Sequence, residues 1–440
     1  MHVRFSPARE ASRAGLLLIG GVKELSVIRS RQSDRSEVQT AATTDFLYTS
    51  RPVDSCIVCA GRQERRKEGM PFGMFGSLRL EGLGMNITAL IMAGGRGERF
   101  WPRSRRNMPK QFLTITDDGK TMIQLTVERI ASLVKMEDIY IATNKDYRNL
   151  VLEQLPGIPE DNILCEPVSR NTAPCIGLGA VHIAKKHKDA LMLVLPSDHL
   201  IKFNKMFVST LRDACRIAEM GDNLVTIGIM PDYPETGYGY IKFNNHEMEG
   251  RAYKVERFVE KPSLEAAKEY LATEEYLWNS GMFIWKVSSI LKNIKKFMPA
   301  MYKGLEQIQS AIGTDEQQMV LEQEFNKMES QSIDYGIMER AKDIYILPGA
   351  FGWDDVGSWL AIERIKKSNE FGNVVDGNVI TVNTHNCIIQ GDRKLIAAVG
   401  LKDIVVVDTE DAILICEKDS TGDIKRVLEN LKICNRDEYI

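Results

Sequence analysis

Apolar positions from residue 88 onward follow two periods, one typical of strands and one typical of helices. Short apolar runs predict strands over residues 88–93, 139–143, 191–196 and 224–229. Apolar positions with helical spacing lie between them, for example over residues 122–134 and 171–186. Strands that alternate with helices of this length are typical of an α/β fold with a mostly parallel, covered sheet. Such folds bind ligands at the carboxyl ends of their strands.

The pattern changes after about residue 365. Short β segments separated by turn residues follow, and a final helix is expected over about residues 423–432. The sequence therefore predicts an α/β domain at residues 85–365 and a small β-rich domain at residues 366–440.

The first 84 residues lack convincing helix or strand periodicity. Their longest apolar run, Ala14–Val22, is followed by Lys23 and not by a small-residue cleavage pattern. Cys56 and Cys59 form a lone CxxC, which two unrelated thiols explain. Because Met85 directly precedes the first clean strand, we expect residues 1–84 to be a disordered leader or a translation-start artefact.

Composition excludes several classes of function. Hydrophobic residues make up 44% of the 440 residues and charged residues 27%, as in ordinary soluble proteins. The net charge of −3 gives no reason to expect nucleic acid or an anionic membrane as a partner. No apolar run approaches the length of a membrane span. The eight cysteines are scattered, which fits a reducing compartment and a cytoplasmic location.

A glycine-rich loop follows the first predicted strand. Gly94, Gly95 and Gly97 let the backbone turn tightly and present N–H groups to a phosphate. Phe100 stands where the dinucleotide fingerprint GxGxxG needs its third glycine, and the GxxxxGK[ST] phosphate loop is absent too. The glycines alone would also fit a plain structural turn.

Two cations beyond the loop favour a polyphosphate ligand. Arg99 lies two residues past Gly97, and Lys110 follows Pro109. Pro102 and Pro109 stiffen the segment, which lowers the entropy cost of ordering both cations.

Aspartates in two further motifs suggest a Mg²⁺ site. Asp198 in "LPSDH" follows a predicted strand, where a carboxylate suits Mg²⁺ or caps a helix N-terminus. Asp354 and Asp355 lie in "GWDDVGSW", and one of them completes the site if this segment folds beside Asp198. Mg²⁺ needs few protein carboxylates because water and phosphate oxygens supply its other ligands.

Polar residues suited to a sugar phosphate occur in "VEKP" and "WNSGMFIW". Glu260 and Asn279 offer polar groups for hydroxyls, and Lys261 offers an ammonium for a phosphate. Gly237 in "ETGYGYIKF" lets the backbone approach a ligand closely. An exposed strand edge that carries a charge pair is the alternative interpretation.

Eight motifs, taken together, resemble the mannose-1-phosphate guanylyltransferases, or GDP-mannose pyrophosphorylases, among the sugar-nucleotide pyrophosphorylases. In chain order they are "AGGRGERFWPRSRRNMPKQF", "EPVSRNTAP", "LPSDH", "GYGYI", "VEKP", "WNSGMFIW", "SIDYGIMER" and "GWDDVGSW". The resemblance covers residues 85–440, and "PKQF", "RNTAP" and "GWDDVGSW" point to the mannose enzymes. It implies a Rossmann-like nucleotidyltransferase domain with a mostly parallel mixed sheet, followed by a small C-terminal β-helical domain.

The resemblance also implies a reaction and its residues. GMP would pass from GTP to α-D-mannose 1-phosphate by Mg²⁺-assisted in-line attack on the α-phosphorus, giving GDP-mannose and pyrophosphate. Catalysis would then rest on positioning and neutralisation of charge. The implied residues are Gly94, Gly95 and Gly97 for the triphosphate, Arg99 and Lys110 for the departing pyrophosphate, Asp198 and Asp355 for Mg²⁺, Lys261 for the sugar phosphate, Gly237, Glu260 and Asn279 for the hexose, and Glu166 and Asn171 for the nucleotide.

Glu166 would accept both the ring N–H and the exocyclic amine of guanine, a pair of donors that adenine lacks. Asp355 is preferred over Asp354 because it matches the family's aspartate before Val-Gly. Glu98 departs from the small hydroxyl residues common at its position, so its carboxylate is expected to point away from the triphosphate. Arg103 stands where the wider superfamily often has an apolar residue.

Two expectations concern the molecule as a whole. Some relatives continue into a phosphomannose isomerase domain, whereas this chain stops at Ile440, so isomerase activity is not expected. A homodimer is one oligomeric state that the sequence leaves open.

Three other functions compete with this interpretation. A different sugar-nucleotide pyrophosphorylase would keep the phosphate and metal residues and change the base and sugar contacts. A non-catalytic nucleotide-sugar sensor would be expected to have lost Arg99, Lys110, Asp198 or Asp355, and all four are present. A nicotinamide dehydrogenase is disfavoured by Phe100 and by the arginine-rich loop.

Overall fold

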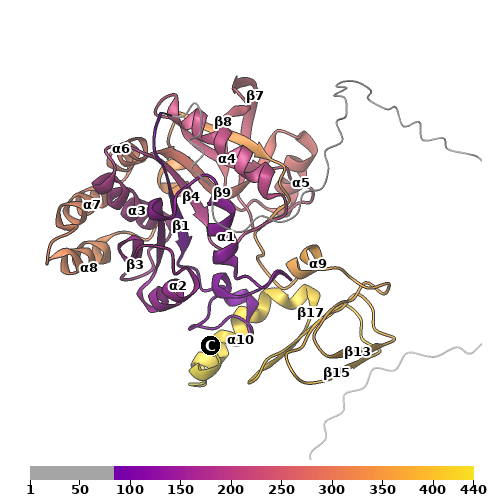
Figure 1. Cartoon of the computed structure of the whole chain (residues 1–440). Coiled ribbons are helices and arrows are strands. Elements are labelled where there is room, and N and C mark those ends of the chain that lie inside the picture. The colour runs from indigo at the N-terminus through magenta and orange to yellow at the C-terminus, as the bar shows by residue number, and fades with distance from the viewer. Residues whose placement is uncertain (1–83) are drawn as a thin grey trace, which may run out of the picture. The chain divides into compact units, whose positions relative to one another are not determined.

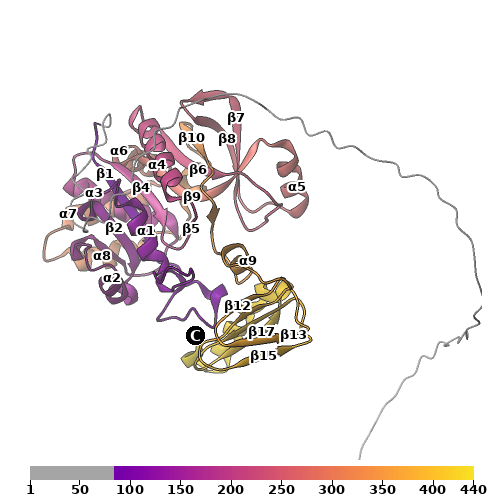
Figure 2. The same cartoon turned by 45° about the vertical axis from the view of Figure 1, so that its right-hand side comes forward.

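The computed structural model describes residues 84–440, so the expectations for the preceding extension, including its CxxC, lie outside the described residues. The larger part of the described chain is built on one nine-stranded sheet, with strand order β3-β2-β1-β4-β9-β6-β10-β8-β7. Figure 1 shows this sheet with its helices, and Figure 2 shows it turned by 45°. Residues 84–440 contain no helix that is long and apolar enough to cross a membrane.

Four parallel strands form one half of the sheet. They are β1 (Ile87–Ala93), β2 (Ile139–Asn144), β3 (Ile163–Glu166) and β4 (Leu191–Pro196). Ala89 of β1 lies opposite Ile139 of β2, and Ile87 lies opposite Leu191 of β4. These strands are almost wholly buried, which explains their continuous apolar sequences.

The other half of the sheet mixes strand directions. It contains β6 (Leu224–Ile229), β7 (Tyr240–Glu249), β8 (Ala252–Val259), β9 (Tyr276–Lys286) and β10 (Ile344–Gly349). Strand β9 lies between β4 and β6 and runs antiparallel to both. Only β8 and β9 run against the other seven strands, so the sheet is mixed and mostly parallel in direction, as predicted.

Helices cover both faces because successive residues of a buried strand point to opposite sides. Ile91 of β1 packs into the core with α1 (Met122–Ile130), α2 (Arg148–Gln154) and α4 (Asn204–Glu219). Leu90, its neighbour, packs into the core on the other face. The helices there are α3 (Thr172–Lys186), α6 (Val287–Phe297), α7 (Pro299–Ala311) and α8 (Gln317–Lys327). A further helix, α5 (Leu264–Thr273), follows β8.

The second domain confirms the predicted β-helical arrangement. Its strands are β12 (Val374–Asp376), β13 (Val379–Val382), β14 (Ile388–Gln390), β15 (Ile396–Val399), β16 (Ile404–Asp408) and β17 (Ile413–Glu417). Equivalent strands of successive turns stack in parallel, β12 on β14 on β16 and β13 on β15. The last helix, α10 (Ile424–Ile433), is within one residue of its predicted bounds.

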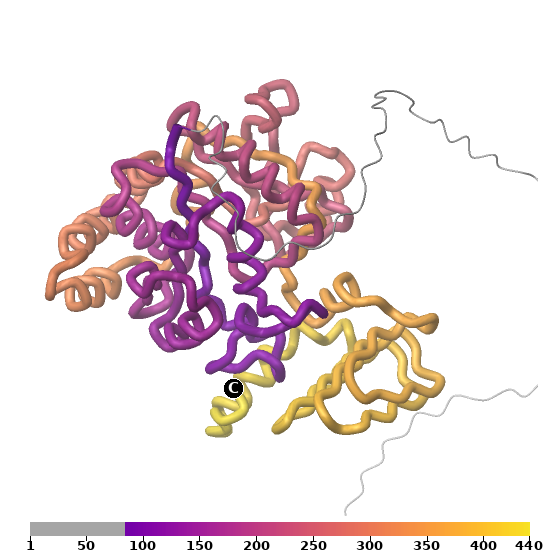
Figure 3. Tube along the Cα trace, viewed as in Figure 1, coloured from indigo at the N-terminus to yellow at the C-terminus, as the bar shows by residue number. Residues whose placement is uncertain are grey.

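One apolar cluster joins the two domains. Phe100 and Trp101 from the segment after β1 pack with Trp359, with Val405 of the β-helix and with Leu428 of α10. Short helix α9 (Ala361–Ile365) contributes to the same cluster. Figure 3 shows the indigo segment after β1 beside the yellow final helix.

Candidate active site

The glycine loop after β1 is shaped by close approaches that need glycine. Gly97 has φ of 61°, and a Cβ there would lie 2.4 Å from Cβ of Lys110. A Cβ on Gly94 would lie 3.2 Å from Oε2 of Glu166. The loop also offers donors, because the N–H groups of Gly95, Arg96 and Gly97 donate to no acceptor within residues 84–440. Such a row of free N–H groups suits an anion.

Buried side chains hold the carbonyl side of this loop. The amide of Gln111 donates to the carbonyl oxygens of Ala93 and Gly95, at 2.8 and 2.9 Å. The hydroxyl of Ser104 donates to the carbonyl of Gly97 at 2.8 Å. The carbonyl groups of the loop are therefore held by hydrogen bonds, while its N–H groups remain available for a ligand. Gln111 belongs to the quoted motif, but its role as a support was not predicted.

Arg99 and Lys110 differ sharply in their surroundings. Arg99 lies in the 3-10 turn Glu98–Phe100, is exposed, and forms no ion pair with any described residue. Lys110 is buried, at 4% exposure. Its ammonium donates to the carbonyls of Asp355 and Val356, both at 2.9 Å, and lies 2.7 Å from Oδ2 of Asp198. All three N–H groups of Lys110 are thus in use.

The Lys110 ammonium brings the two predicted metal ligands together. Asp198 follows β4, and Asp355 follows the two-residue strand β11 (Trp353–Asp354), which pairs with β5 (Leu200–Ile201). Burial, the largest single influence, raises the pKa of Asp198, but the charges of Lys110 and His199 and the hydrogen bonds to its carboxylate together outweigh it, so the pKa is lowered. Asp198 is therefore a carboxylate at neutral pH.

The two adjacent aspartates of "GWDDVGSW" have different tasks. Asp354 is buried and accepts two hydrogen bonds from Arg364 and one from the N–H of Val356. Asp355 accepts from the hydroxyl of Tyr238 and from the N–H of Gly357, both at Oδ1. Its second oxygen has no donor within the described residues, and the residue lines a cleft. This geometry favours Asp355 over Asp354 as a metal ligand.

The backbone between these groups is strained. Val356 has φ of 50°, a conformation that β-branched residues rarely adopt. Its carbonyl accepts from Lys110 and its N–H donates to Asp354, so neighbouring contacts hold it there. Such strain is concentrated at functional sites.

The residues present fit Mg²⁺ with few protein ligands. Within residues 84–440, no three His, Cys, Asp or Glu side chains gather in a way that would hold a metal ion. Asp198 and Asp355 each keep one carboxylate oxygen without a donor among these residues. Two carboxylates suffice when phosphate oxygens supply further ligands.

The predicted sugar residues line one cleft of about 370 Å³, together with Asp355. Gly237, Glu260, Lys261 and Asn279 all contribute to it. Asn279 lies on β9, donates to Asp334 at 2.7 Å, and accepts from the N–H of Gly281 at 3.0 Å. Lys261 is exposed and lies 3.4 Å from Glu260.

Asp334 is a cleft residue that sequence reasoning did not single out. It begins a one-turn π-helix, Asp334–Met338, in the quoted motif "SIDYGIMER". Burial raises its pKa to about 6, against the hydrogen bond from Asn279, and Glu260 adds to the rise. The π-helical turn was a weak signal, since such turns are frequent at functional sites.

Glu166 lies at the carboxyl end of β3, beside Gly94. It is 5% exposed, and burial raises its pKa to about 7, with a hydrogen bond to Cys175 acting in the opposite direction. Its Oε1 is buried without a hydrogen-bond partner. Asn171 caps α3 through its side chain at φ of 68°, so it supports the start of this helix.

Comparisons with known proteins agree with this geometry. The family model described as "Nucleotidyl transferase" matches residues 88–370, and that of a "MannoseP isomerase/GMP-like beta-helix domain" matches residues 377–431. A mannose-1-phosphate guanylyltransferase of Salmonella montevideo is 41% identical over 362 residues, covering 80% of this chain and 76% of that protein. One of Escherichia coli K12 is 42% identical over 362 residues, covering 80% and 75%.

A solved structure from Thermus thermophilus, titled as a mannose-1-phosphate geranyltransferase, superposes with a TM-score of 0.72. It is 35% identical and covers 79% of this chain and 100% of its own. The extent of these matches, over both domains and at this identity, identifies the chain as a member of the nucleotidyl transferase family, within the mannose-1-phosphate guanylyltransferases.

Proposed function

We propose that the chain transfers GMP from GTP to α-D-mannose 1-phosphate, giving GDP-mannose and pyrophosphate. A phosphate oxygen of the sugar forms a bond to the α-phosphorus of GTP. The α–β bridging bond breaks, and pyrophosphate leaves with its electron pair. The observation that supports this proposal best is the junction at Lys110, which joins the phosphate loop to Asp198 and Asp355 beside the sugar cleft.

The loop binds the triphosphate through its backbone. Gly95 and Gly97 offer free N–H groups and carry no side chain, so the contact does not need the side chain of Glu98. Glu98 lies 4.0 Å from Arg96. Arg99, exposed and unpaired within the described residues, is free to stabilise charge on the departing pyrophosphate.

Lys110 acts at the junction, with its charge beside the reacting phosphates. Contact with pyrophosphate requires it to release at least one of its three present acceptors. Mg²⁺ held by Asp198 and Asp355 would neutralise negative charge on phosphate oxygens. In-line attack would require the loop and the sugar cleft to hold the two substrates on opposite sides of the α-phosphorus.

Specificity is assigned to two groups of residues. Glu166 accepts from guanine when it is ionised, and its unpartnered Oε1 is consistent with an acceptor that waits for a ligand. Asn171 supports this nucleotide side as the cap of α3. Glu260, Asn279 and Gly237 contact the hexose, and Lys261 binds the sugar phosphate.

Pyrophosphate release tests the proposal. The full chain is incubated with each of GTP, ATP, UTP and dTTP and with several hexose 1-phosphates, with and without Mg²⁺. Release that needs GTP, mannose 1-phosphate and Mg²⁺ is expected. Preference for another pair would indicate a different sugar-nucleotide pyrophosphorylase, and binding without release would indicate a sensor.

We also propose a cytoplasmic homodimer. The six cysteines of the described residues are all free thiols, which fits a reducing compartment. Large apolar side chains are exposed on the β-helix strands, among them Ile380, Val399, Ile413 and Ile415. Where such side chains form a contiguous patch, they favour burial against a second copy. Light scattering on the purified chain measures its mass, and a monomer would contradict the dimer.

A further inference from the structure

Residues 437–440, which follow α10, contact the segment that follows the phosphate loop, residues 99–110, through their backbone. The carbonyl of Tyr439 accepts from the indole N–H of Trp101 at 2.6 Å and from the guanidinium of Arg105 at 2.9 Å. The carbonyl of Ile440 accepts from the N–H of Arg106 at 3.0 Å. Three donors of the segment between Arg99 and Lys110 thus bond to the backbone oxygens of Tyr439 and Ile440.

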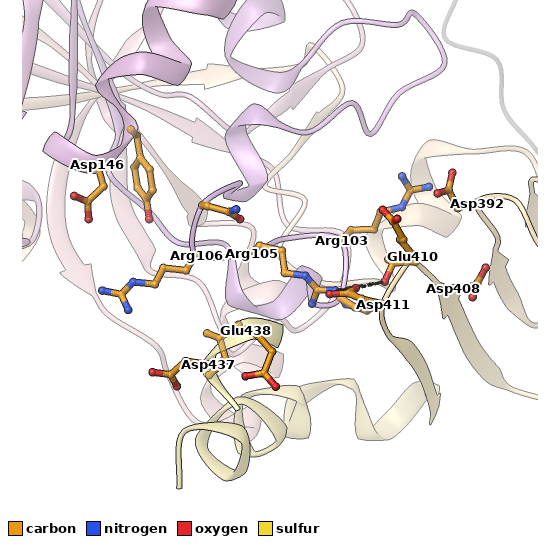
Figure 4. A pocket seen from close by; sticks show the side chains of 15 residues that line it. Arg103, Arg105, Arg106, Asp146, Asp392, Asp408, Glu410, Asp411, Asp437 and Glu438 are labelled. Carbon is orange, nitrogen blue, oxygen red and sulfur yellow. Dashed lines mark hydrogen bonds and ion pairs between the residues drawn. The ribbon is translucent and has the colours of Figure 1, made fainter. Parts of the chain in front are cut away.

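A side-chain contact supports the same arrangement. Arg105 also lies 2.6 Å from Asp411 of the β-helical domain, and only 14% of its side chain is exposed. Figure 4 shows this pair, with Asp437 and Glu438 lining the same pocket. The guanidinium lies 5.6 Å from the centre of the Trp101 ring. Arg105 therefore links the loop to two segments of the second domain.

These contacts reach the residues that the proposed reaction uses. The carbonyl of Trp101 accepts from Trp359 at 3.0 Å, and Phe100 packs 5.1 Å from the Trp359 ring. Arg99 directly precedes Phe100. Arg105 and Met108 exchange two backbone hydrogen bonds of 3.0 Å, which leads the chain to Pro109 and Lys110. The segment between Arg99 and Lys110 is therefore held on its outer side by residues 437–440.

The inner side of the loop has a separate support. Gln111 binds the carbonyls of Ala93 and Gly95 and makes no contact with residues 437–440 in the described hydrogen bonds. Loss of the outer support should leave the fold of the sheet intact and give Arg99 more freedom.

We propose that residues 437–440 are a positioning element for catalysis, which sets the place of Arg99 and the phosphate loop. The inference rests on the proposed function for the role of the loop. A loop that is displaced by about 1 Å costs roughly a hundredfold in rate. The sugar cleft lies on β9 and the segments beside it, so its affinity for mannose 1-phosphate should not change.

Deletion of residues 437–440 from the full chain is the main test, with Trp101→Phe and Asp411→Asn as milder variants. Trp101→Phe keeps an aromatic ring and removes the N–H donor, and Asp411→Asn removes the charge that holds Arg105. Glu438→Ala is the matched control, because it keeps the backbone carbonyls. For each protein, kcat, both KM values, the melting temperature and local hydrogen exchange over residues 94–108 are measured.

The deletion is expected to lower kcat by roughly a hundredfold, with faster exchange over residues 94–108 and a KM for mannose 1-phosphate within about twofold. Trp101→Phe and Asp411→Asn should lie between the deletion and the control. The proposal would be overturned if kcat and hydrogen exchange were unchanged in the deletion variant. It would also be overturned if kcat, both KM values and the melting temperature all deteriorated to the same extent, which would indicate general destabilisation. If the deletion does not fold, the two milder variants decide by the same criteria. Hydrogen exchange is measured without substrate and does not depend on the reaction. If the proposed function fails, the exchange data therefore still test whether residues 437–440 hold the loop in place.

Discussion

At the scale of single residues, nearby charges decide whether a desolvated carboxyl group is ionised. Asp198 is kept ionised by Lys110, whereas Glu166 has no cation partner in the described contacts and its pKa is raised. Two carboxyl groups at the carboxyl ends of strands in one sheet, Glu166 on β3 and Asp198 after β4, therefore respond differently to pH, and each response can be measured.

Glu166→Gln is expected to weaken GTP binding and to stabilise the fold at high pH. The pKa of Glu166 rises from 4.5 to about 7 on folding, so the folded state keeps a proton that the unfolded state releases. This contribution to stability is full below pH 4.5 and is lost as pH rises through 7. The loss amounts to up to about 3 kcal/mol, and glutamine avoids it.

Melting curves at pH 4.5 and pH 8 test the stability part. The variant should gain stability over the parent chain at pH 8 and little at pH 4.5. In the parent chain, the KM for GTP should fall as pH rises from 6 to 8, because the acceptor of guanine becomes ionised. A pH-independent difference between the two proteins would contradict this assignment.

Asp355→Asn and Asp354→Asn should separate catalysis from stability. Asp355→Asn loses transition-state stabilisation of several kcal/mol, on the scale of a metal ligand, while its melting temperature stays close to that of the parent chain. Asp354→Asn leaves Arg364 without its anion and should destabilise the fold by about 2 kcal/mol. Kinetics at varied Mg²⁺ and thermal melts check both. A normal Mg²⁺-dependent rate in Asp355→Asn would refute the metal assignment.

At the scale of elements, the strands with continuous apolar sequences were predictable and the interrupted one was not. The runs over residues 191–196 and 224–229 match β4 and β6, because strands buried on both faces need no polar alternation. In β9, Asn279, Ser280 and Gly281 interrupt the apolar pattern, and the pairing with β6 shifts in register there. This irregularity includes the cleft residue Asn279, and it is the reason why the sequence pattern did not predict the strand.

The positions of the site residues were predictable where a side chain or a glycine carries the signal, while their roles stay predictions. The loop glycines follow β1, Asp198 follows β4, and the sugar residues line one cleft with Asp355. The use of all three Lys110 N–H groups was not predictable, because two of their acceptors are main-chain carbonyls that leave no trace in the sequence. The raised pKa of Asp334 likewise comes from burial, which depends on the packed structure.

Gly97→Ala is expected to destabilise the loop, with Gly95→Ala as its control. Alanine at position 97 would hold a left-handed conformation that costs about 1–2 kcal/mol, and its Cβ would also meet Lys110. A Cβ on Gly95 meets nothing within 4 Å, so that variant should stay within about 0.5 kcal/mol of the parent chain. Denaturant unfolding gives both values. Equal stability of the two variants would show that the close approach at Gly97 is unimportant.

Arg99→Ala and Lys110→Ala should each lower kcat by on the order of a hundredfold. For Arg99 the loss arises because its positive charge no longer stabilises the departing pyrophosphate. Arg99→Lys should recover only part of the rate, since an ammonium cannot replace the guanidinium fork. For Lys110 the loss includes disruption of the junction, so its melting temperature should fall as well. Arg103→Ala is the control and should be milder. Steady-state kinetics measure these values. A wild-type kcat in Arg99→Ala would show that the loop is only a basic turn without a catalytic role.

At the scale of the whole molecule, a chain that begins at Met85 is expected to match the full chain in activity and melting temperature. The first strand starts at Ile87 and the nucleotidyl transferase match starts at residue 88. The support at this end comes from Glu219, which accepts from the N–H groups of Gly84 and Met85. Enzyme assays and thermal melts of both chains make the comparison, and an insoluble or inactive short chain would refute the prediction.

The place of β9 in the sheet has a consequence for synthesis on the ribosome. β4 ends at Pro196, but its neighbour on one side, β9, begins only at Tyr276. At about 5–20 residues per second, several seconds pass in which the apolar edge of β4 has no partner. Exposed edges of this kind pair with other chains. The nascent protein is therefore most open to aggregation in that interval, and slower translation of residues 197–275 should lower the yield of soluble enzyme.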